Sequence, residues 1–238
     1  ELVFFGYDFG PISLRYHVAD RDGKLLRTVE IEKPIPTMMH DFGVTASRVI
    51  FMDLPVAFDM EMALAGKGLP FRWRDDMPAR LGLLPRAATK DEVQWIEIDP
   101  CFVYHPLNAY DDGDRIIFDV VRHARTLVGG QLEGGGEVRL ERWTIDPARE
   151  RVTSEIISDL GQEFPRVDPR VECRPHRYGY TVEFELQVGA RGLIKHDLEA
   201  RTEARHDVGP AGTASEGVFV PVGAGEDEGY ILSVVYDG

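Results

Sequence analysis

The sequence lacks several features that define whole classes of protein. It has only two cysteines, Cys101 and Cys173, with neither CxxC nor zinc-ribbon spacing. A disulfide scaffold is therefore not expected, and the reducing cytoplasm is the expected compartment. Its 27 Lys and Arg form no cluster and, against 41 Asp and Glu, leave a formal net charge of -14. Phosphate binding needs a basic surface, so we expect no nucleic-acid partner.

Long apolar runs are missing as well. No run reaches the roughly 18 to 20 residues that cross a bilayer, and no basic and apolar signal segment opens the chain. The chain starts inside an apolar strand pattern at 2–7, without methionine, and stops in another at 230–238. Natural termini seldom interrupt such patterns, so we expect a segment of a longer protein.

Helical periodicity is scarce, whereas short β-rich runs separated by Gly, Pro, Asp and Asn recur along the chain. This composition predicts an all-β sandwich, barrel or propeller. One pattern repeats, an apolar residue followed six positions later by an acidic one. The copies start at Leu14, Val93, Leu140 and Leu193, at intervals of 79, 47 and 53 residues. The last two intervals are close to the ~40 to 50 residues of a four-stranded propeller blade.

We therefore predict a partial β-propeller domain over 1–238. The first, third and fourth copies continue through turns into a second β-rich run, as hairpins do. The long first interval predicts an insertion over 55–85, with a helix over 56–65 that caps the propeller. The alternative is that 55–73 forms an apolar lip, which touches a membrane or admits an apolar substrate.

Candidate metal-binding residues lie between the hairpins and the strands that follow them. His40 precedes the apolar run 48–54, and His105 precedes the run 115–121. Glu163 and Glu216 each lie seventeen residues after the acidic position of their repeat (163 − 146 and 216 − 199). Successive blades would thus direct His, His, Glu and Glu towards the propeller axis.

Imidazole suits iron, copper, zinc or nickel. A metal-bound histidine usually donates its other N–H to a carboxylate, so the four residues are consistent with two ligands and two such partners. Direct coordination by a glutamate is a competing geometry. The plainest alternative is that each histidine is an ordinary core or surface residue.

The other histidines are expected to have no role at the metal. His17 and His196 occupy equivalent positions of the repeat and are predicted to be structural. Three more histidines have arginines close by in the sequence and are predicted to be solvated: His123, His176 and His206.

Several stretches together resemble the carotenoid cleavage oxygenases. They are MMHDFGVT at 38–45, FMDLP at 51–55, MPARLG at 77–82, HPLNAY at 105–110, EFPR at 163–166 and EGYILS at 228–233. They follow the order of that family and span nearly the whole chain.

The resemblance implies a seven-bladed β-propeller, of which this chain supplies roughly four blades. One Fe(II) on its axis would be held by four histidines, with three glutamates behind them. His40 and His105 match the second and third ligands, and Glu163 and Glu216 match two of the glutamates. The remaining two ligands would lie outside this chain.

The activity implied is cleavage of a carbon–carbon double bond of a carotenoid or apocarotenoid by dioxygen, which yields two carbonyl products. The expected partners are thus a hydrophobic polyene and oxygen. Alternatives are a lignostilbene-type dioxygenase, a member that uses iron as a Lewis acid without oxygen, and a propeller scaffold without catalysis.

Overall fold

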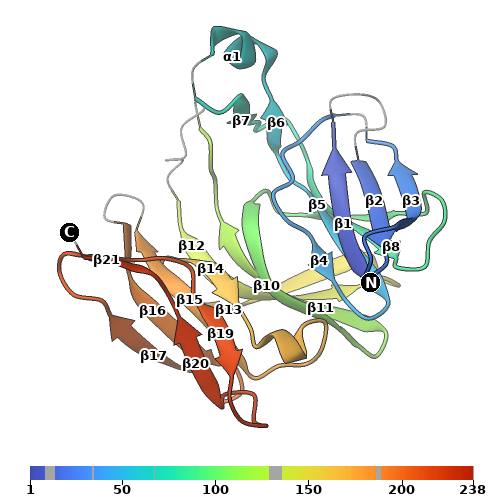
Figure 1. Cartoon of the computed structure of the whole chain (residues 1–238). Coiled ribbons are helices and arrows are strands. Elements are labelled where there is room, and N and C mark those ends of the chain that lie inside the picture. The colour runs from blue at the N-terminus through green and yellow to red at the C-terminus, as the bar shows by residue number, and fades with distance from the viewer. Residues whose placement is uncertain (9–13, 34, 67, 129–135, 186–188, 238) are drawn as a thin grey trace. The chain divides into compact units, whose positions relative to one another are not determined.

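The computed structural model describes residues 1–8, 14–33, 35–66, 68–128, 136–185 and 189–237, and almost all of its regular structure is β-strand (Figure 1). The chain divides into two compact units. The first comprises Glu1–Met39, Ser47–Phe102 and Arg125–Gly134, and the second comprises His40–Ala46, Val103–Ala124 and Gly135–Gly238.

The first unit begins with a three-stranded antiparallel sheet. Its strands are β1 (Leu2–Tyr7), β2 (Leu14–Ala19) and β3 (Leu25–Ile31), in that order. Alternate residues of β2 are buried, which is the two-residue period of a strand with one face on the core. The hairpin predicted after the first copy of the repeat is confirmed. It turns at Asp22-Gly23, where Gly23 adopts the left-handed backbone that the turn needs, with φ of 81°.

A second antiparallel sheet of this unit contains β5 (Arg48–Asp53), β8 (Ala79–Pro85) and β9 (Gln94–Ile98). Five of the six residues of β5 are buried, because this strand is covered on both faces. Its apolar run was therefore read correctly as a strand.

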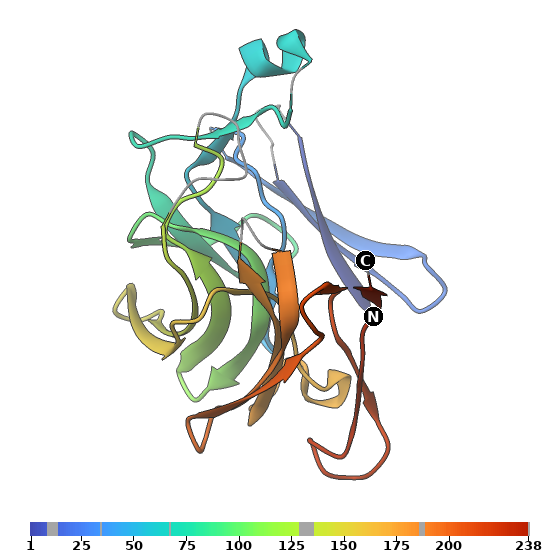
Figure 2. The same ribbon diagram turned by 90° about the vertical axis from the view of Figure 1, so that its left-hand side faces the viewer.

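Between β5 and β8 the chain forms a hairpin that contains one short helix. It consists of β6 (Val56–Phe58), α1 (Met60–Ala65) and β7 (Phe71–Trp73), and it stands out from the unit in Figure 2. The helix is shorter than predicted because Asp59 caps it, with Oδ1 accepting the N–H of Met62 at 2.9 Å. Of the stretch 55–85, the last seven residues form β8 and belong to the sheet. In the part of the chain that the structure describes, no helix has the length and apolar character to span a membrane.

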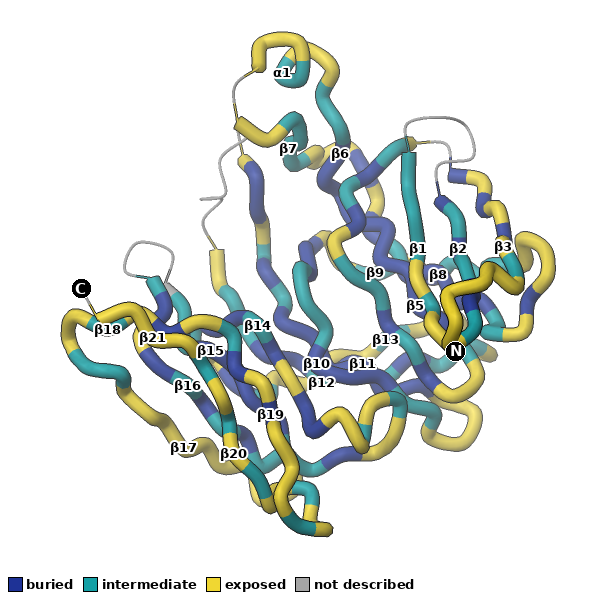
Figure 3. Tube along the Cα trace, viewed as in Figure 1, coloured by how far each residue is buried: buried dark blue, intermediate teal, exposed yellow. Residues whose placement is uncertain are grey.

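The second unit contains two four-stranded antiparallel sheets. The strands of one are β10 (Phe102–Asp112), β11 (Arg115–His123), β12 (Val138–Asp146) and β13 (Arg151–Ser158). Those of the other are β14 (Gln162–Arg166), β15 (Tyr178–Glu185), β16 (Gly189–Asp197) and β17 (Thr202–Asp207), with the 3-10 helix η1 (Pro169–Val171) after β14. The outermost strand β17 is exposed along its whole length, whereas β11 is mostly buried (Figure 3).

Two short strand pairs complete the second unit. β18 (Gly212–Ala214) pairs with β21 (Val235–Asp237), and β19 (Val218–Pro221) pairs with β20 (Gly229–Leu232).

The predicted repeat is correct for three of its four copies. β2, β12 and β16 are each the next-to-last strand of a sheet and are each followed by a hairpin partner. The copy that starts at Val93 is wrong, since β9 is the last strand of its sheet and the next-to-last strand is β8. An apolar residue and a later acidic one mark any half-buried strand that ends at a turn, so the pattern cannot tell the two positions apart.

Candidate metal centre

The two histidines predicted to share a metal lie side by side in the second unit. His40 lies just ahead of the short strand β4 (Gly43–Val44), and His105 lies on β10. Their Nε2 atoms are 3.2 Å apart, and their rings are almost perpendicular, at 89°. Both side chains thus present the same ring nitrogen to one place, although 65 residues separate them in the chain.

Glu163, on β14, contacts the opposite edge of the His105 ring. Its Oε2 is 2.7 Å from His105 Nδ1 and also accepts the backbone N–H of Phe164 at 2.9 Å. An ionised carboxylate only accepts hydrogen bonds, so Nδ1 of His105 carries the proton. The Nε2 atom of neutral His105 then has a free lone pair, which is what a metal ligand needs.

The surroundings of the pair favour a charged Glu163 and a neutral His40. Burial by itself raises the pKa of Glu163, but hydrogen bonds from His105 and His123 outweigh it and bring that pKa down to about 2. Burial lowers the pKa of His40, and the neighbouring His105 lowers it further. At neutral pH the site therefore contains the uncharged imidazole of His40 and an ionised carboxylate hydrogen-bonded to the ring of His105, and a carboxylate on the far side of an imidazole is the usual arrangement around protein metals.

The geometry of the two imidazoles fits part of a metal shell. Two histidine nitrogens bound to one metal at about 2.1 Å and roughly at right angles would be about 3 Å apart. The observed separation of 3.2 Å is of this size. Among the described residues, no three His, Cys, Asp or Glu side chains are arranged to hold a metal ion. The described residues therefore form no closed metal site, and the pair of imidazoles could supply at most two ligands.

The two glutamates differ in their placement. Glu163 lies behind His105, on the Nδ1 side, so its position is that of a partner of a ligand rather than of a ligand itself. Glu216, between β18 and β19, forms an ion pair with Arg166 at the end of β14, and its side chain is 37% exposed. Within the part of the chain that the structure describes, the ion-pair partner of Glu216 is therefore Arg166.

The prediction that His123 is solvated was wrong. Its side chain is buried at the end of β11, and its Nε2 lies 2.5 Å from Oε1 of Glu163. Nearby arginines were a poor guide, because successive residues of a strand face opposite sides. A usable signal was the turn at Asp112-Gly113. A hairpin folded about that turn brings His123 opposite the strand segment that contains His105, and the ring of Tyr104 is indeed 5.1 Å from that of His123.

The same prediction was also wrong for His176 and correct for His206. His176 is buried between β10 and β11, with Nε2 3.3 Å from Asp119 and Nδ1 3.1 Å from the amide of Asn108. A buried carboxylate and amide can replace the water that an imidazole would otherwise bind. His206 is exposed on β17.

His17 and His196 are structural, as predicted. His17 stacks on Phe4 and hydrogen-bonds Thr28, while His196 is buried beside Thr181 at 3.1 Å.

Phe164 shapes the site through its backbone. Its φ is 54°, a left-handed conformation that costs a residue other than glycine about 1–3 kcal/mol. This conformation accompanies the hydrogen bond from its N–H to Glu163, and its ring lies 5.2 Å from that of His105. Strained backbone of this kind concentrates at functional sites, so it supports the assignment of this place as one.

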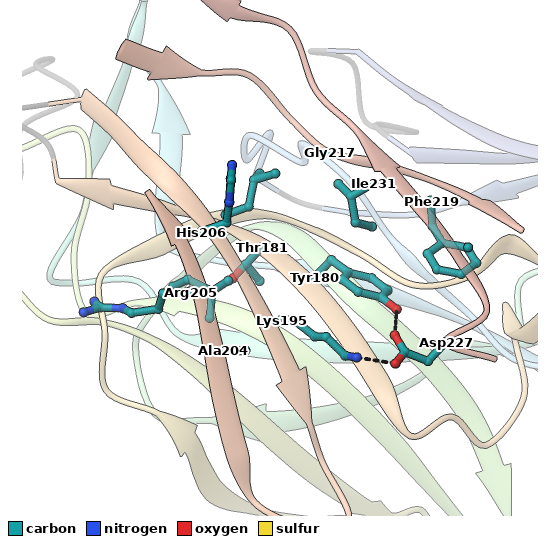
Figure 4. A pocket seen from close by; sticks show the side chains of 13 residues that line it. Tyr180, Thr181, Lys195, Ala204, Arg205, His206, Gly217, Phe219, Asp227 and Ile231 are labelled. Atoms are coloured by element: carbon teal, nitrogen blue, oxygen red, sulfur yellow. Dashed lines mark hydrogen bonds and ion pairs between the residues drawn. The ribbon is translucent and has the colours of Figure 1, made fainter. Parts of the chain in front are cut away.

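A separate cavity of about 430 Å³ lies in the second unit between β15–β17 and the β19–β20 pair (Figure 4). Three of its polar residues contact one another: Tyr180 donates to Asp227 at 2.9 Å, and Lys195 forms an ion pair with the same carboxylate. Burial, together with the bond to Asp227, raises the pKa of Tyr180, so this phenol stays protonated. None of the predicted site residues lines this cavity, and we do not assign the candidate site to it.

Comparison with known proteins gives a consistent result along the whole chain. A family model described as retinal pigment epithelial membrane protein matches residues 1–238. The chain is 34% identical to a carotenoid cleavage oxygenase of Mycobacterium tuberculosis, over 98% of this chain and 57% of that protein. It is 31% identical to a carotenoid 9,10(9',10')-cleavage dioxygenase of Crocus sativus, over 100% of this chain and 48% of that protein. The chain thus spans about half the length of the curated relatives it matches.

Solved structures agree with these matches. A crystal structure of cobalt-substituted ACO, the apocarotenoid oxygenase of Synechocystis, superimposes with a TM-score of 0.88 at 30% identity, over 99% of this chain and 52% of that one. The prediction of an all-β chain that forms part of a propeller is confirmed. The number of blades stays a prediction.

Proposed function

Because this chain belongs to the family of retinal pigment epithelial membrane protein and the carotenoid cleavage oxygenases, we propose that the complete protein cleaves a carbon–carbon double bond of a carotenoid or apocarotenoid with dioxygen. The cofactor proposed is Fe(II), with His40 and His105 as two of its ligands. The relatives named above act, by name, on carotenoids or apocarotenoids, so the carotenoid version takes precedence over the stilbene one.

The observation that carries the proposal is the convergence of the two Nε2 atoms with an ionised carboxylate behind one of them. Bound Fe(II) would supply the open positions and the redox chemistry that activate dioxygen. The chain's own residues have the task of presenting neutral imidazole in a fixed orientation. Glu163 orients the ring of His105, since its hydrogen bond selects the tautomer with a free Nε2 and restrains the rotation of the ring.

The test is the substitution His105→Ala in the complete protein. We expect it to lower the bound iron, measured by elemental analysis, and to abolish the transfer of labelled dioxygen into carbonyl products. His17→Ala, a strand histidine of the first unit, is the matched control and should change neither quantity. Full iron and full turnover in His105→Ala would remove this residue from the site. Parent protein that contains no stoichiometric metal would favour a scaffold without catalysis.

We further propose that the α1 hairpin contacts a membrane surface. The side chains of Met60, Leu64 and Leu69 are 61%, 81% and 43% exposed, and together they make an apolar tip. Flotation with phospholipid vesicles should recover the complete protein, and the double substitution Met60→Glu and Leu64→Glu should abolish that recovery. Equal recovery of parent and variant would show that the hairpin is not the contact.

A further inference from the structure

His123 is a buried histidine to which the proposed function gives no role. It ends β11 with only 6% of its surface exposed, and its Nε2 is 2.5 Å from Oε1 of Glu163. The ionised carboxylate of Glu163 can only accept hydrogen bonds, so Nε2 of His123 carries the proton, as Nδ1 of His105 does. The carboxylate of Glu163 therefore accepts a hydrogen bond from each of two imidazoles.

The two oxygens of Glu163 are used unequally. Oε2 accepts from His105 and from the backbone of Phe164, whereas in the described residues Oε1 accepts from His123 alone. Without His123, one oxygen of a buried, ionised carboxylate would lose its partner. Such a group recovers hydrogen bonds by turning or by admitting water, and both responses disturb the bond from Oε2 to His105.

We infer that His123 is a positioning residue for the metal centre, which acts through Glu163 to hold His105. The imidazole anchors Oε1 so that the plane of the carboxylate stays aligned with the Nδ1–H group of His105. The ring of Tyr104, 5.1 Å away and nearly perpendicular at 86°, packs against His123 and restrains it in turn. This inference rests on the proposed function, because the group to be positioned is a metal ligand.

A purely structural histidine would act differently. Its removal would lower the free energy of unfolding and leave the affinity of the folded protein for metal unchanged. A positioning residue changes that affinity, and a side chain that restores the missing donor should recover it.

The test compares His123→Phe with His123→Gln in the complete protein. Phenylalanine keeps a planar ring but has no donor, whereas the amide nitrogen of glutamine can donate from about the position of Nε2. His17→Phe is the matched control, since His17 also lies on a strand with one side-chain hydrogen bond, but in the first unit. The probe is Co(II), whose visible absorption reports both its affinity and its coordination. NMR of nitrogen-labelled imidazoles in the metal-free protein reports the N–H proton of His105.

We expect His123→Phe to weaken Co(II) binding on the order of tenfold, the lower end of the range for partners of metal ligands. In the metal-free protein it should also shift the His105 Nδ1–H resonance. Glutamine should restore both quantities towards the parent values, and His17→Phe should leave them unchanged.

Two results would overturn the inference. If His123→Phe folds, keeps the parent affinity for Co(II) and leaves the His105 resonance unmoved, the inference is contradicted. The proposed metal centre would not be affected by that result. A parent protein that binds neither Co(II) nor Fe(II) would overturn the proposed function and the inference with it. If His123→Phe does not fold, His123→Asn takes its place, because its amide is too short to reach Oε1 of Glu163. Weakened Co(II) binding and a shifted His105 resonance are then expected, and parent values of both would overturn the inference.

Discussion

At the scale of single residues, Glu163 shows how the surroundings of a side chain decide its chemistry. Burial alone would push this carboxyl towards its neutral form, yet two imidazoles and one backbone amide stabilise the charge. The result is a buried carboxylate that stays ionised at neutral pH and can orient His105. A glutamate in this stretch of sequence would otherwise be expected on the surface.

The low pKa of Glu163 predicts a stability loss in acid. The folded pKa of about 2 lies below the ordinary value of 4.5, so the contribution of Glu163 is complete above about 4.5 and is lost as the pH falls towards 2. Denaturant unfolding at a series of pH values should show a steeper loss in this window for the parent than for Glu163→Gln. The control Glu172→Gln, an exposed carboxylate of the same unit, should follow the parent. Identical slopes in parent and Glu163→Gln would contradict the assignment.

A second buried carboxylate has a structural role. Asp119, fully buried on β11, receives two 2.8 Å hydrogen bonds from Arg142 and also lies beside His176. Asp119→Ala leaves the part-buried guanidinium of Arg142 and the buried His176 without their acceptor, and a buried donor without a partner costs about 1–3 kcal/mol. Urea unfolding should reveal this loss. Asp146→Ala, at the end of β12 in the same sheet, breaks an ion pair with the exposed Arg149 of the following turn and should cost far less. A similar cost for both would show that burial is not the cause.

At the scale of elements, cross-strand pairs determine how the sheets fit together. In the register of β8 and β9, Gly82 lies opposite Trp95. The guanidinium of Arg80 lies 4.3 Å above the Trp95 ring. The glycine leaves room for the indole, so the pair works as one packed unit. In the sequence alone, neither Trp95 nor Gly82 indicates that the two residues pack against each other.

This pairing predicts that Gly82→Ala is destabilising. A Cβ atom at this position would lie 2.6 Å from Trp95 Cζ3 and 2.9 Å from Val93 Cγ1, so the neighbours must move. Overpacking of this kind typically costs about 1–3 kcal/mol, measurable as a lower free energy of unfolding. Gly6→Ala is the matched control, because among the described residues the nearest atom to its Cβ would be His17 Nε2, at 3.8 Å. Unchanged stability of Gly82→Ala would mean that the Trp95 ring moves away freely.

At the scale of the whole molecule, the candidate centre is assembled from segments far apart in the chain. His40, His105 and Glu163 come from three segments separated by 65 and 58 residues, and they meet within the second unit. Catalytic metal sites usually have at least three protein ligands. The described residues contain two candidates, His40 and His105.

We therefore expect the complete protein to retain stoichiometric iron through gel filtration and the isolated 238-residue chain to lose it. Elemental analysis of the eluted fractions measures this directly. Circular dichroism of the isolated chain supplies the control for folding. Tight, stoichiometric iron in the isolated chain would show that further ligands lie within it.

The sequence by itself determined the all-β class, the three predicted repeat hairpins and the segments that carry His40, His105 and Glu163. These depend on local rules: a two-residue period, turn dipeptides and the order of motifs along the chain. The membership of a family of carotenoid cleavage oxygenases followed from the same motifs, and the comparisons agree with it.

Only the tertiary structure decided which side chains meet. It put His123 on Glu163 and His176 on Asp119, and it gave Glu216 an arginine as its partner. It also showed that the strand at β9 closes a sheet instead of preceding a hairpin partner. The physical reason is that burial and hydrogen bonding are properties of a place in the fold. A histidine beside an arginine in the chain can face the opposite side of its strand, where a buried carboxylate from a distant segment accepts a hydrogen bond from its ring.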